Sequence, residues 1–181
     1  MSADPKRAAQ FTLPARLLHW VMVAMVVAML FIGVAMVASL GSYHTLVSIH
    51  RPLGIAILIL VVARFAVRLR GPLPPFLATM SATERRLASA SEYALYALMF
   101  ALPLVGWAML SAARYPIVLW GSWHLPPILP HSPWLYAALR RMHTVLAYIL
   151  FATFVAHLSA VLFHALVKRD GLLRRMLPWR A

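Results

Sequence analysis

The chain has 181 residues, 63% of them hydrophobic, and it carries seventeen Lys and Arg against four Asp and Glu. This composition is typical of an integral membrane protein, and the basic residues cluster between apolar runs rather than along one solvated face, so a nucleic-acid-binding role is excluded. Cysteine is absent, which also excludes disulfides, iron–sulfur clusters, thiolate haem ligands and cysteine-based zinc sites.

Four apolar segments are long enough to cross a hydrocarbon core of about 30 Å as helices. The first is too long for a signal-peptide core and no small-residue cleavage pattern follows it, so we expect it to remain in the mature protein. The sequence therefore predicts an all-α fold, an integral membrane four-helix bundle, with residues 1–181 forming a single membrane domain. The expected spans are about 15–39, 46–69, 92–113 and 136–167.

Prolines and glycines interrupt the apolar pattern at defined places. Pro52 lies near the start of the second span, where proline is tolerated. Pro103 and Gly106 lie inside the third span, which predicts a kink or the close approach of something large. The segment RYPIVLWGSWHLPPILPHSPW, after the third span, has too many prolines for a helix. We expect it to form a compact aromatic cap at one membrane surface.

Basic residues set the expected orientation, because cytoplasmic loops of membrane proteins are enriched in Lys and Arg. The two loops that join span one to span two and span three to span four carry few of them. Both termini are therefore expected in the cytoplasm. The basic residues on the expected cytoplasmic side are Lys6, Arg7, Arg16, Arg68, Arg70, Arg85, Arg86, Lys168, Arg169, Arg174, Arg175 and Arg180.

Eight histidines are present, and ionisable groups inside a membrane are functional candidates by default. On the expected topology, His50 and His143 lie near the outer ends of the second and fourth spans, and His19 lies about one turn inside the first. His157 and His164 share one helix face with His143, because their spacing is close to whole turns. The sequence predicts an outer pair, His50 with His143, and an inner pair, His19 with either His157 or His164.

Neutral imidazoles on facing helices are suitable axial ligands for haem iron, and two stacked sites would carry electrons across the bilayer. Arg51 and Arg64 are candidate partners for haem propionates or for anionic lipid. A proton pathway or metal transport would use the same residue type, so the residues alone leave these alternatives open. The loop histidines, His44, His124 and His131, are expected to have structural roles.

Several stretches resemble the bacterial cytochrome b561 family, which consists of four-helix dihaem membrane cytochromes. They cover nearly the full chain. The resemblance implies two haems b with bis-histidine ligation, ubiquinone as electron acceptor, and a place among the lipids of the bacterial cytoplasmic (inner) membrane. The similar stretches are RLLHWVM, HRPLG, PLVGWAMLSA with WHLPPI, and HTVLAY followed by HLSAVLFHALVKRDGLLRRMLP.

Carried over residue by residue, the resemblance assigns His50 and His143 to the outer haem, and His19 and His157 to the inner haem. His164 matches a second histidine of the family, and is a candidate quinone-site residue or the alternative inner ligand. Arg51 stands where the family commonly has a lysine, so the positive charge is retained.

The best-understood branch of the family oxidises superoxide at the periplasmic face and reduces quinone, so the resemblance implies an oxidoreductase of this type. No side chain is expected to be catalytic itself, because the haem iron does the chemistry. The outer loops contain no acidic residue, so outer arginines would attract the superoxide anion. These arginines are Arg51, Arg114, Arg140 and Arg141.

Two alternative functions remain at this point. One is a cytochrome b subunit that links a partner dehydrogenase or hydrogenase to the quinone pool, which fits the absence of a soluble domain. The other is a non-redox membrane transporter that uses the same histidines. The sequence also leaves open whether the chain associates with a redox partner subunit or forms a homo-oligomer.

Overall fold

The computed structural model describes residues 10–119 and 121–179. Four long helices follow one another: α1 (Leu13–Ala38), α2 (Tyr43–Arg70), α3 (Ala82–Ala112) and α4 (Pro133–Leu162). A π-helical turn, η1 (Phe163–Lys168), continues α4, and a short 3-10 helix, η2 (Leu173–Arg175), follows. The residues Lys6, Arg7 and Arg180 of the orientation argument, and Trp120 of the expected cap, lie outside the described residues.

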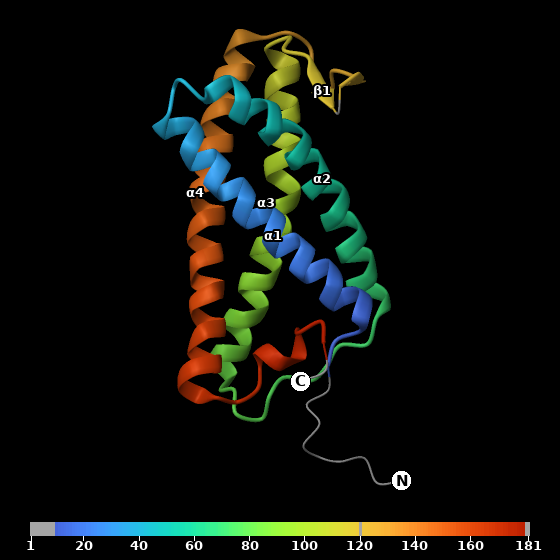
Figure 1. The fold of residues 1–181 in the computed structure, drawn as a ribbon, viewed down its shortest axis with the longest axis vertical. Coiled ribbons are helices and arrows are strands. Elements are labelled where there is room, and N and C mark those ends of the chain that lie inside the picture. The colour runs from blue at the N-terminus through green and yellow to red at the C-terminus, as the bar shows by residue number, and fades with distance from the viewer. Residues whose placement is uncertain (1–9, 120, 180–181) are drawn as a thin grey trace.

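The helices form the bundle that the sequence predicts. Helix α1 packs along α2, α2 contacts α3, and α3 packs along α4. All four are long and apolar enough to cross a membrane when η1 is counted with α4. The α2–α3 connection, η2 and both ends of the described chain gather at one end of the bundle, which we call the tail end (Figure 1). The α1–α2 turn and the α3–α4 connection lie at the other, the hairpin end.

Helix α3 begins at Ala82 rather than near residue 92 as expected. The reason is a capping box: the Glu84 backbone N–H donates to Ser81 Oγ (3.2 Å), and the Ser81 backbone N–H donates to the Glu84 carboxylate (2.7 Å). This pair satisfies two N–H groups that a helix start would otherwise leave unbonded. Residues 82–91 are therefore helical, although they are too hydrophilic to count as part of a membrane span.

Proline has different positions in the four helices. Pro133 opens α4, where it costs no backbone hydrogen bond, and Ser132 caps this start by accepting from the Leu135 backbone N–H (3.3 Å). Pro52 lies well inside α2, because this helix begins at Tyr43, earlier than expected. Pro103 lies inside α3. Neither of the two internal prolines ends its helix.

The proline-rich segment between α3 and α4 contains a small β-hairpin, which the sequence did not predict. Strands β1 (Ile117–Leu119) and β2 (Trp123–Leu125) pair antiparallel, with Val118 opposite His124. Gly121 in the turn has a φ of 89°, a backbone conformation that favours glycine. The Trp107 indole N–H donates to the Pro126 carbonyl (2.9 Å), so the segment is held against the end of α3.

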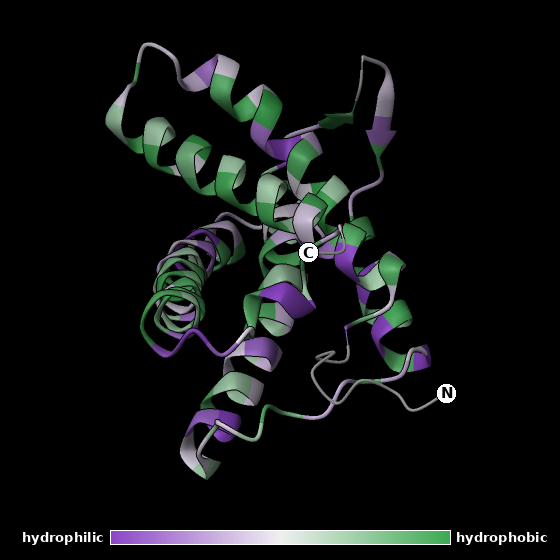
Figure 2. Ribbon diagram, turned by 60° about the horizontal axis from the view of Figure 1, so that its bottom comes forward, coloured by the Kyte–Doolittle hydropathy of each residue, from purple (hydrophilic) through white to green (hydrophobic). Residues whose placement is uncertain are grey.

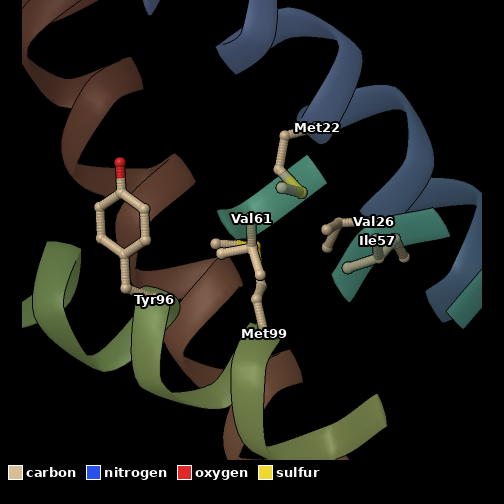
Figure 3. Packing of buried hydrophobic residues seen from close by; sticks show 6 residues of the cluster. All are labelled: Met22, Val26, Ile57, Val61, Tyr96 and Met99. Carbon is tan, nitrogen blue, oxygen red and sulfur yellow. The ribbon is translucent and has the colours of Figure 1, made fainter. Parts of the chain in front are cut away.

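The tightly packed core is small. One cluster joins α1, α2 and α3, and its buried members are Met22, Val26, Ile57, Val61, Tyr96 and Met99 (Figure 3). Most other apolar side chains on the helices are exposed or only partly buried, as expected for surfaces that face lipid tails. Figure 2 shows hydrophobic residues along the helices and hydrophilic residues gathered toward their ends.

Candidate functional site

The imidazole rings of His50 and His143 face each other near the hairpin end. His50 comes from α2 and His143 from α4, and their ring centroids are 6.2 Å apart with an angle of 67° between the ring planes. An imidazole nitrogen lies about 2 Å from a metal that it ligates, so two rings on opposite sides of one iron have centroids about 6 Å apart. The separation therefore fits bis-histidine ligation of one iron.

The surroundings of these rings also fit a bound group. The Nδ1 atom of His50 is buried and has no hydrogen-bond partner among the described residues, which normally requires an explanation such as a ligand or water. The buried His143 ring lies close to the Leu102 carbonyl. A Cβ at Gly106 would lie 3.3 Å from Cε1 of His143. A side chain at this position would be tight, and the imidazole would have to move by a few tenths of an ångström, so the close approach expected at Gly106 involves the imidazole itself. The residues present fit the haem expected here.

A second group of candidate residues lies toward the tail end. His19 on α1 and His157 on α4 lie near each other, and both lie near Arg64 of α2. The Arg64 guanidinium donates to the Ala15 carbonyl (3.2 Å), one turn before His19. Arg64 is thus placed beside both candidate inner ligands, where a partner for a haem propionate has to be.

Next to this group is a small polar pocket of about 10 Å³. Arg68 and Glu92 close one side of it with two hydrogen bonds between guanidinium and carboxylate, of 2.7 and 3.0 Å. Glu92 and Tyr96 are not among the site residues predicted from the sequence. Their spacing of four residues on one helix face, matching that of Arg64 and Arg68, was the available signal. The pocket is lined by Phe11, Ala15, Arg64, Arg68, Glu92, Tyr96 and Met176.

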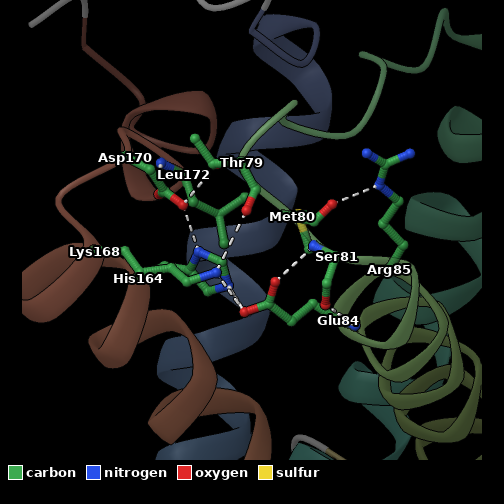
Figure 4. A network of polar contacts seen from close by, with 9 residues as sticks. All are labelled: Thr79, Met80, Ser81, Glu84, Arg85, His164, Lys168, Asp170 and Leu172. Atoms are coloured by element: carbon green, nitrogen blue, oxygen red, sulfur yellow. Dashed lines mark hydrogen bonds and ion pairs between the residues drawn. The ribbon is translucent and has the colours of Figure 1, made fainter.

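His164 lies in η1 within a different set of contacts (Figure 4). Its side chain is only 6% exposed, its Nδ1 is 2.6 Å from Oδ2 of Asp170, and its Nε2 is 4.0 Å from Oε1 of Glu84. Lys168 donates to the same Glu84 oxygen (2.5 Å), and the Thr79 hydroxyl donates to Asp170 (3.2 Å). This network ties the end of α4 to the start of α3.

Asp170 is held as a carboxylate in this network. Burial would raise its pKa, but hydrogen bonds from His164, from the Leu172 backbone N–H and from Thr79 outweigh burial, so the pKa of Asp170 lies below its ordinary value. The buried His164 ring therefore has a charged partner on its Nδ1 side.

Arginines at the hairpin end are exposed or only partly buried. Arg51 donates a long hydrogen bond to the Pro116 carbonyl (3.4 Å). Arg140 and Arg141 are exposed and line an open pocket of about 540 Å³ on α4. Arg114 is exposed at the end of α3. The acidic residues that the structure describes all lie toward the tail end, so the hairpin end is positively charged; they are Glu84, Glu92 and Asp170.

The loop histidines make local contacts, as expected. His124 Nδ1 lies 2.9 Å from the Ser122 carbonyl, and His131 Nδ1 lies 3.0 Å from the Ala112 carbonyl. His44 is exposed near the start of α2.

Comparison with known proteins identifies relatives along most of the chain. A family model described as prokaryotic cytochrome b561 matches residues 10–179. A probable superoxide oxidase CybB of Yersinia pestis is 33% identical over 134 residues, which cover 72% of this chain and 73% of that protein. Cytochrome b561 homolog 2 of Escherichia coli K12 is 30% identical over 162 residues, covering 88% of this chain and 86% of its own. Cytochrome b561 homolog 1 of the same strain is 28% identical over 140 residues, covering 77% and 79%.

Proposed function

This chain belongs to the prokaryotic cytochrome b561 family, and we propose that it is a dihaem cytochrome that oxidises superoxide outside the membrane and reduces ubiquinone. The family implies haem b, electron transfer and a multi-pass place in the bacterial inner membrane. The observation that carries the proposal is the facing pair of His50 and His143, with centroids 6.2 Å apart.

His50 and His143 would hold the outer haem. Each haem, when bound, supplies an iron that takes up and releases one electron at a time. The two histidines fix the orientation of the group between α2 and α4, and the apolar helix faces around them keep water away. Gly106 contributes by leaving room for the His143 ring.

His19 and His157 would hold the inner haem. Their nearness to each other supports this pairing. The contacts of His164 support it as well, because its Nδ1 is engaged by Asp170 and its Nε2 faces Glu84. A ring held between carboxylates at the end of α4 is poorly placed to turn toward α1. Arg64 would neutralise a propionate of the inner haem.

The hairpin end would receive the substrate. Superoxide is a small anion, and a positive surface raises both its local concentration and its rate of encounter. Arg51, Arg114, Arg140 and Arg141 supply this charge, and the described acidic residues lie at the opposite end. The name of the Yersinia pestis relative, a probable superoxide oxidase, supports this choice of substrate.

The tail end would face the cytoplasm and provide protons. Two superoxide anions would each lose one electron and leave as dioxygen, and ubiquinone would take up the two electrons with two protons to become ubiquinol. We place His164 at this step as a donor to a quinone carbonyl. Its Nδ1 is held by the Asp170 carboxylate at 2.6 Å, whereas its Nε2 makes no hydrogen bond to any described residue and faces Glu84 at 4.0 Å.

Stopped-flow spectroscopy of the purified protein with a superoxide source and a soluble ubiquinone tests the proposal. We expect rapid appearance of reduced haem b bands and formation of ubiquinol, both abolished by added superoxide dismutase. Haem reduction that persists with dismutase, or absence of ubiquinol, would contradict the superoxide assignment. Activity that requires a co-purified dehydrogenase or hydrogenase would instead favour the connecting-subunit alternative. Family membership argues against the non-redox transporter.

A further inference from the structure

The hydroxyl group of Tyr96 is a buried polar atom that the proposed mechanism does not use. Tyr96 is only 6% exposed. Its hydroxyl makes no hydrogen bond of ordinary geometry to a described residue, and the Arg64 guanidinium beside it can only donate, so the Tyr96 O–H has no acceptor there. Leaving a buried hydroxyl unpaired costs about 1–3 kcal/mol, so tyrosine is retained at such positions when its O–H has a partner. Figure 3 shows the ring at the edge of the apolar cluster, standing apart from the aliphatic and methionine side chains.

The Arg64 guanidinium lies beside Tyr96. Its carbon is 5.6 Å from the centroid of the Tyr96 ring, it interacts with the Tyr96 hydroxyl, and one of its N–H groups donates to the Ala15 carbonyl. A guanidinium has five N–H donors, so Arg64 can bind a further acceptor without giving up this bond. Tyr96 and Arg64 therefore present two kinds of donor to the same small pocket.

Charge and size restrict what this pocket can accept. Its lining includes two guanidinium groups, Arg64 and Arg68, and one carboxylate, Glu92. Since Glu92 neutralises only Arg68, to which it is bonded, one positive charge remains for an anion. The volume of about 10 Å³ is close to the smallest space that holds one water-sized group. A quinone ring does not fit, whereas one oxygen of a carboxylate does.

We propose that Tyr96 is a propionate anchor: its hydroxyl donates to the same carboxylate of the inner haem that Arg64 neutralises. This inference rests on the proposed function, because the carboxylate comes from a haem held by His19 and His157. Arg64 lies near both of these histidines, so a carboxylate attached to a group between them can reach the pocket. The site thereby fixes the rotation of that group within its plane, which two axial ligands alone leave free.

The substitution Tyr96→Phe removes the donor and keeps the ring that packs in the core. Loss of the donor leaves more negative charge on the carboxylate and favours ferric iron, so the inner haem should become harder to reduce. At a fixed ambient potential we expect its reduced-to-oxidised ratio to fall about three- to tenfold, and the outer haem should not change. Redox titration gives this ratio, and a haemochrome assay checks that haem content stays constant.

Infrared redox-difference spectra identify the partner directly. With haem labelled with ¹³C at the propionates, the carboxylate band that shifts on reduction should move in Tyr96→Phe, and in the unmodified protein it should shift when water is replaced by D₂O. Tyr93→Phe is the matched control, because Tyr93 lies one turn earlier on α3 and is 66% exposed. It should leave both readouts unchanged.

Three outcomes decide between the interpretations. An unchanged propionate band in Tyr96→Phe would overturn the proposal and indicate that water satisfies the hydroxyl. If Tyr96→Phe loses the inner haem, the unmodified protein with ring-¹³C-labelled tyrosine decides, and the absence of any tyrosine C–O band in the redox-difference spectrum overturns the proposal. A single haem in the unmodified protein would be a failure of the dihaem function itself.

Discussion

The hairpin end and the tail end of the bundle place the same side chain, histidine, in different electrostatic surroundings. At the hairpin end, the rings of His50 and His143 lie beside each other, the His50 Nδ1 atom is unbonded among the described residues, and the charged residues around them are arginines. At the tail end, carboxylates accompany the basic residues, as in the pair Arg68 with Glu92. Both ends carry a net positive charge, but among the described residues only the tail end has carboxylates that offset part of it.

The two ends also differ in how the chain is held together. At the tail end, the Trp20 indole N–H donates to the Met176 carbonyl (2.7 Å) and Arg16 donates to the Leu177 carbonyl (2.8 Å). These bonds connect the first helix to the last residues of the described chain. At the hairpin end, strand β1 of the short β-hairpin contacts α2. On the proposed function, the tail end would exchange protons with the cytoplasm, which requires fixed polar groups, and the hairpin end would receive a small anion, which requires accessible charge.

The largest effect should come from removing one candidate ligand at each end. His143→Ala should eliminate the outer haem and retain the inner one, whereas His157→Ala should do the reverse, because a haem iron held on one side only is bound weakly. Haemochrome assay and redox titration measure the content and identity of the remaining haem. His44→Ala, an exposed histidine, is the control and should keep both. Full haem content in His143→Ala would remove the basis for the outer site.

Within the tail end, His157 and His164 are the two alternative candidates for the second ligand of the inner haem. His164→Ala should retain both haems, because its ring bonds Asp170 and we assign it no iron, but it should slow quinone reduction by about tenfold or more as a proton donor is lost. Haem reduction by superoxide should stay fast. Loss of the inner haem in His164→Ala, with His157→Ala unaffected, would reverse the assignment of the two residues.

The helical bundle and the depth of the histidines could be predicted because lipid imposes strong rules on length and polarity. Spacing along α4 and the expected depth of His50 predicted the outer pair, and the structure places their ring centroids 6.2 Å apart in an edge-on arrangement. Their role as ligands stays a prediction. The inner pairing remained open from residues alone, because His157 and His164 share a helix face.

Other features depended on contacts that no periodicity reports. The early start of α3 depends on the reciprocal bonds of Ser81 and Glu84, and hydropathy does not detect a polar helical extension. The hairpin forms in a segment whose prolines only exclude helix. In the sequence, Tyr96 is one more aromatic residue in an apolar span. Only the structure shows that its hydroxyl is buried and makes no hydrogen bond of ordinary geometry to a described residue.

A moderate effect is expected from neutralising charge at the hairpin end. Arg140→Gln combined with Arg141→Gln should slow haem reduction by superoxide severalfold at low salt, and the difference from the unmodified protein should shrink as salt rises, because screening acts over about 10 Å at 0.1 M. Stopped-flow rates at increasing salt measure it.

A matched control at the opposite end isolates the effect of location. Arg70→Gln combined with Arg86→Gln removes the same charge from two exposed positions at the tail end. This double variant should leave the superoxide rate and its salt dependence nearly unchanged. Equal slowing in both double variants would mean that total charge, rather than its position at the hairpin end, controls the encounter.

The smallest effect should be on stability, through Asp170. Because hydrogen bonds hold its folded-state pKa below the ordinary value of 3.8, the carboxylate stabilises the fold at pH values above 3.8, and this contribution is lost as the pH falls through the lower folded-state pKa. Asp170→Asn should therefore reduce stability at neutral pH by about 1–3 kcal/mol, since the bonds to His164 and Thr79 weaken. Thermal unfolding in detergent should show a lower Tm than the unmodified protein at pH 7. The two midpoints should converge at strongly acidic pH, where both side chains are neutral.

Arg169→Gln is the control, because Arg169 is an exposed neighbour whose guanidinium bonds only the Leu166 carbonyl within the described chain. It should not shift the midpoint measurably. A constant difference between Asp170→Asn and the unmodified protein at every pH would show that packing of the side chain, and not its charge, holds η1 against α3.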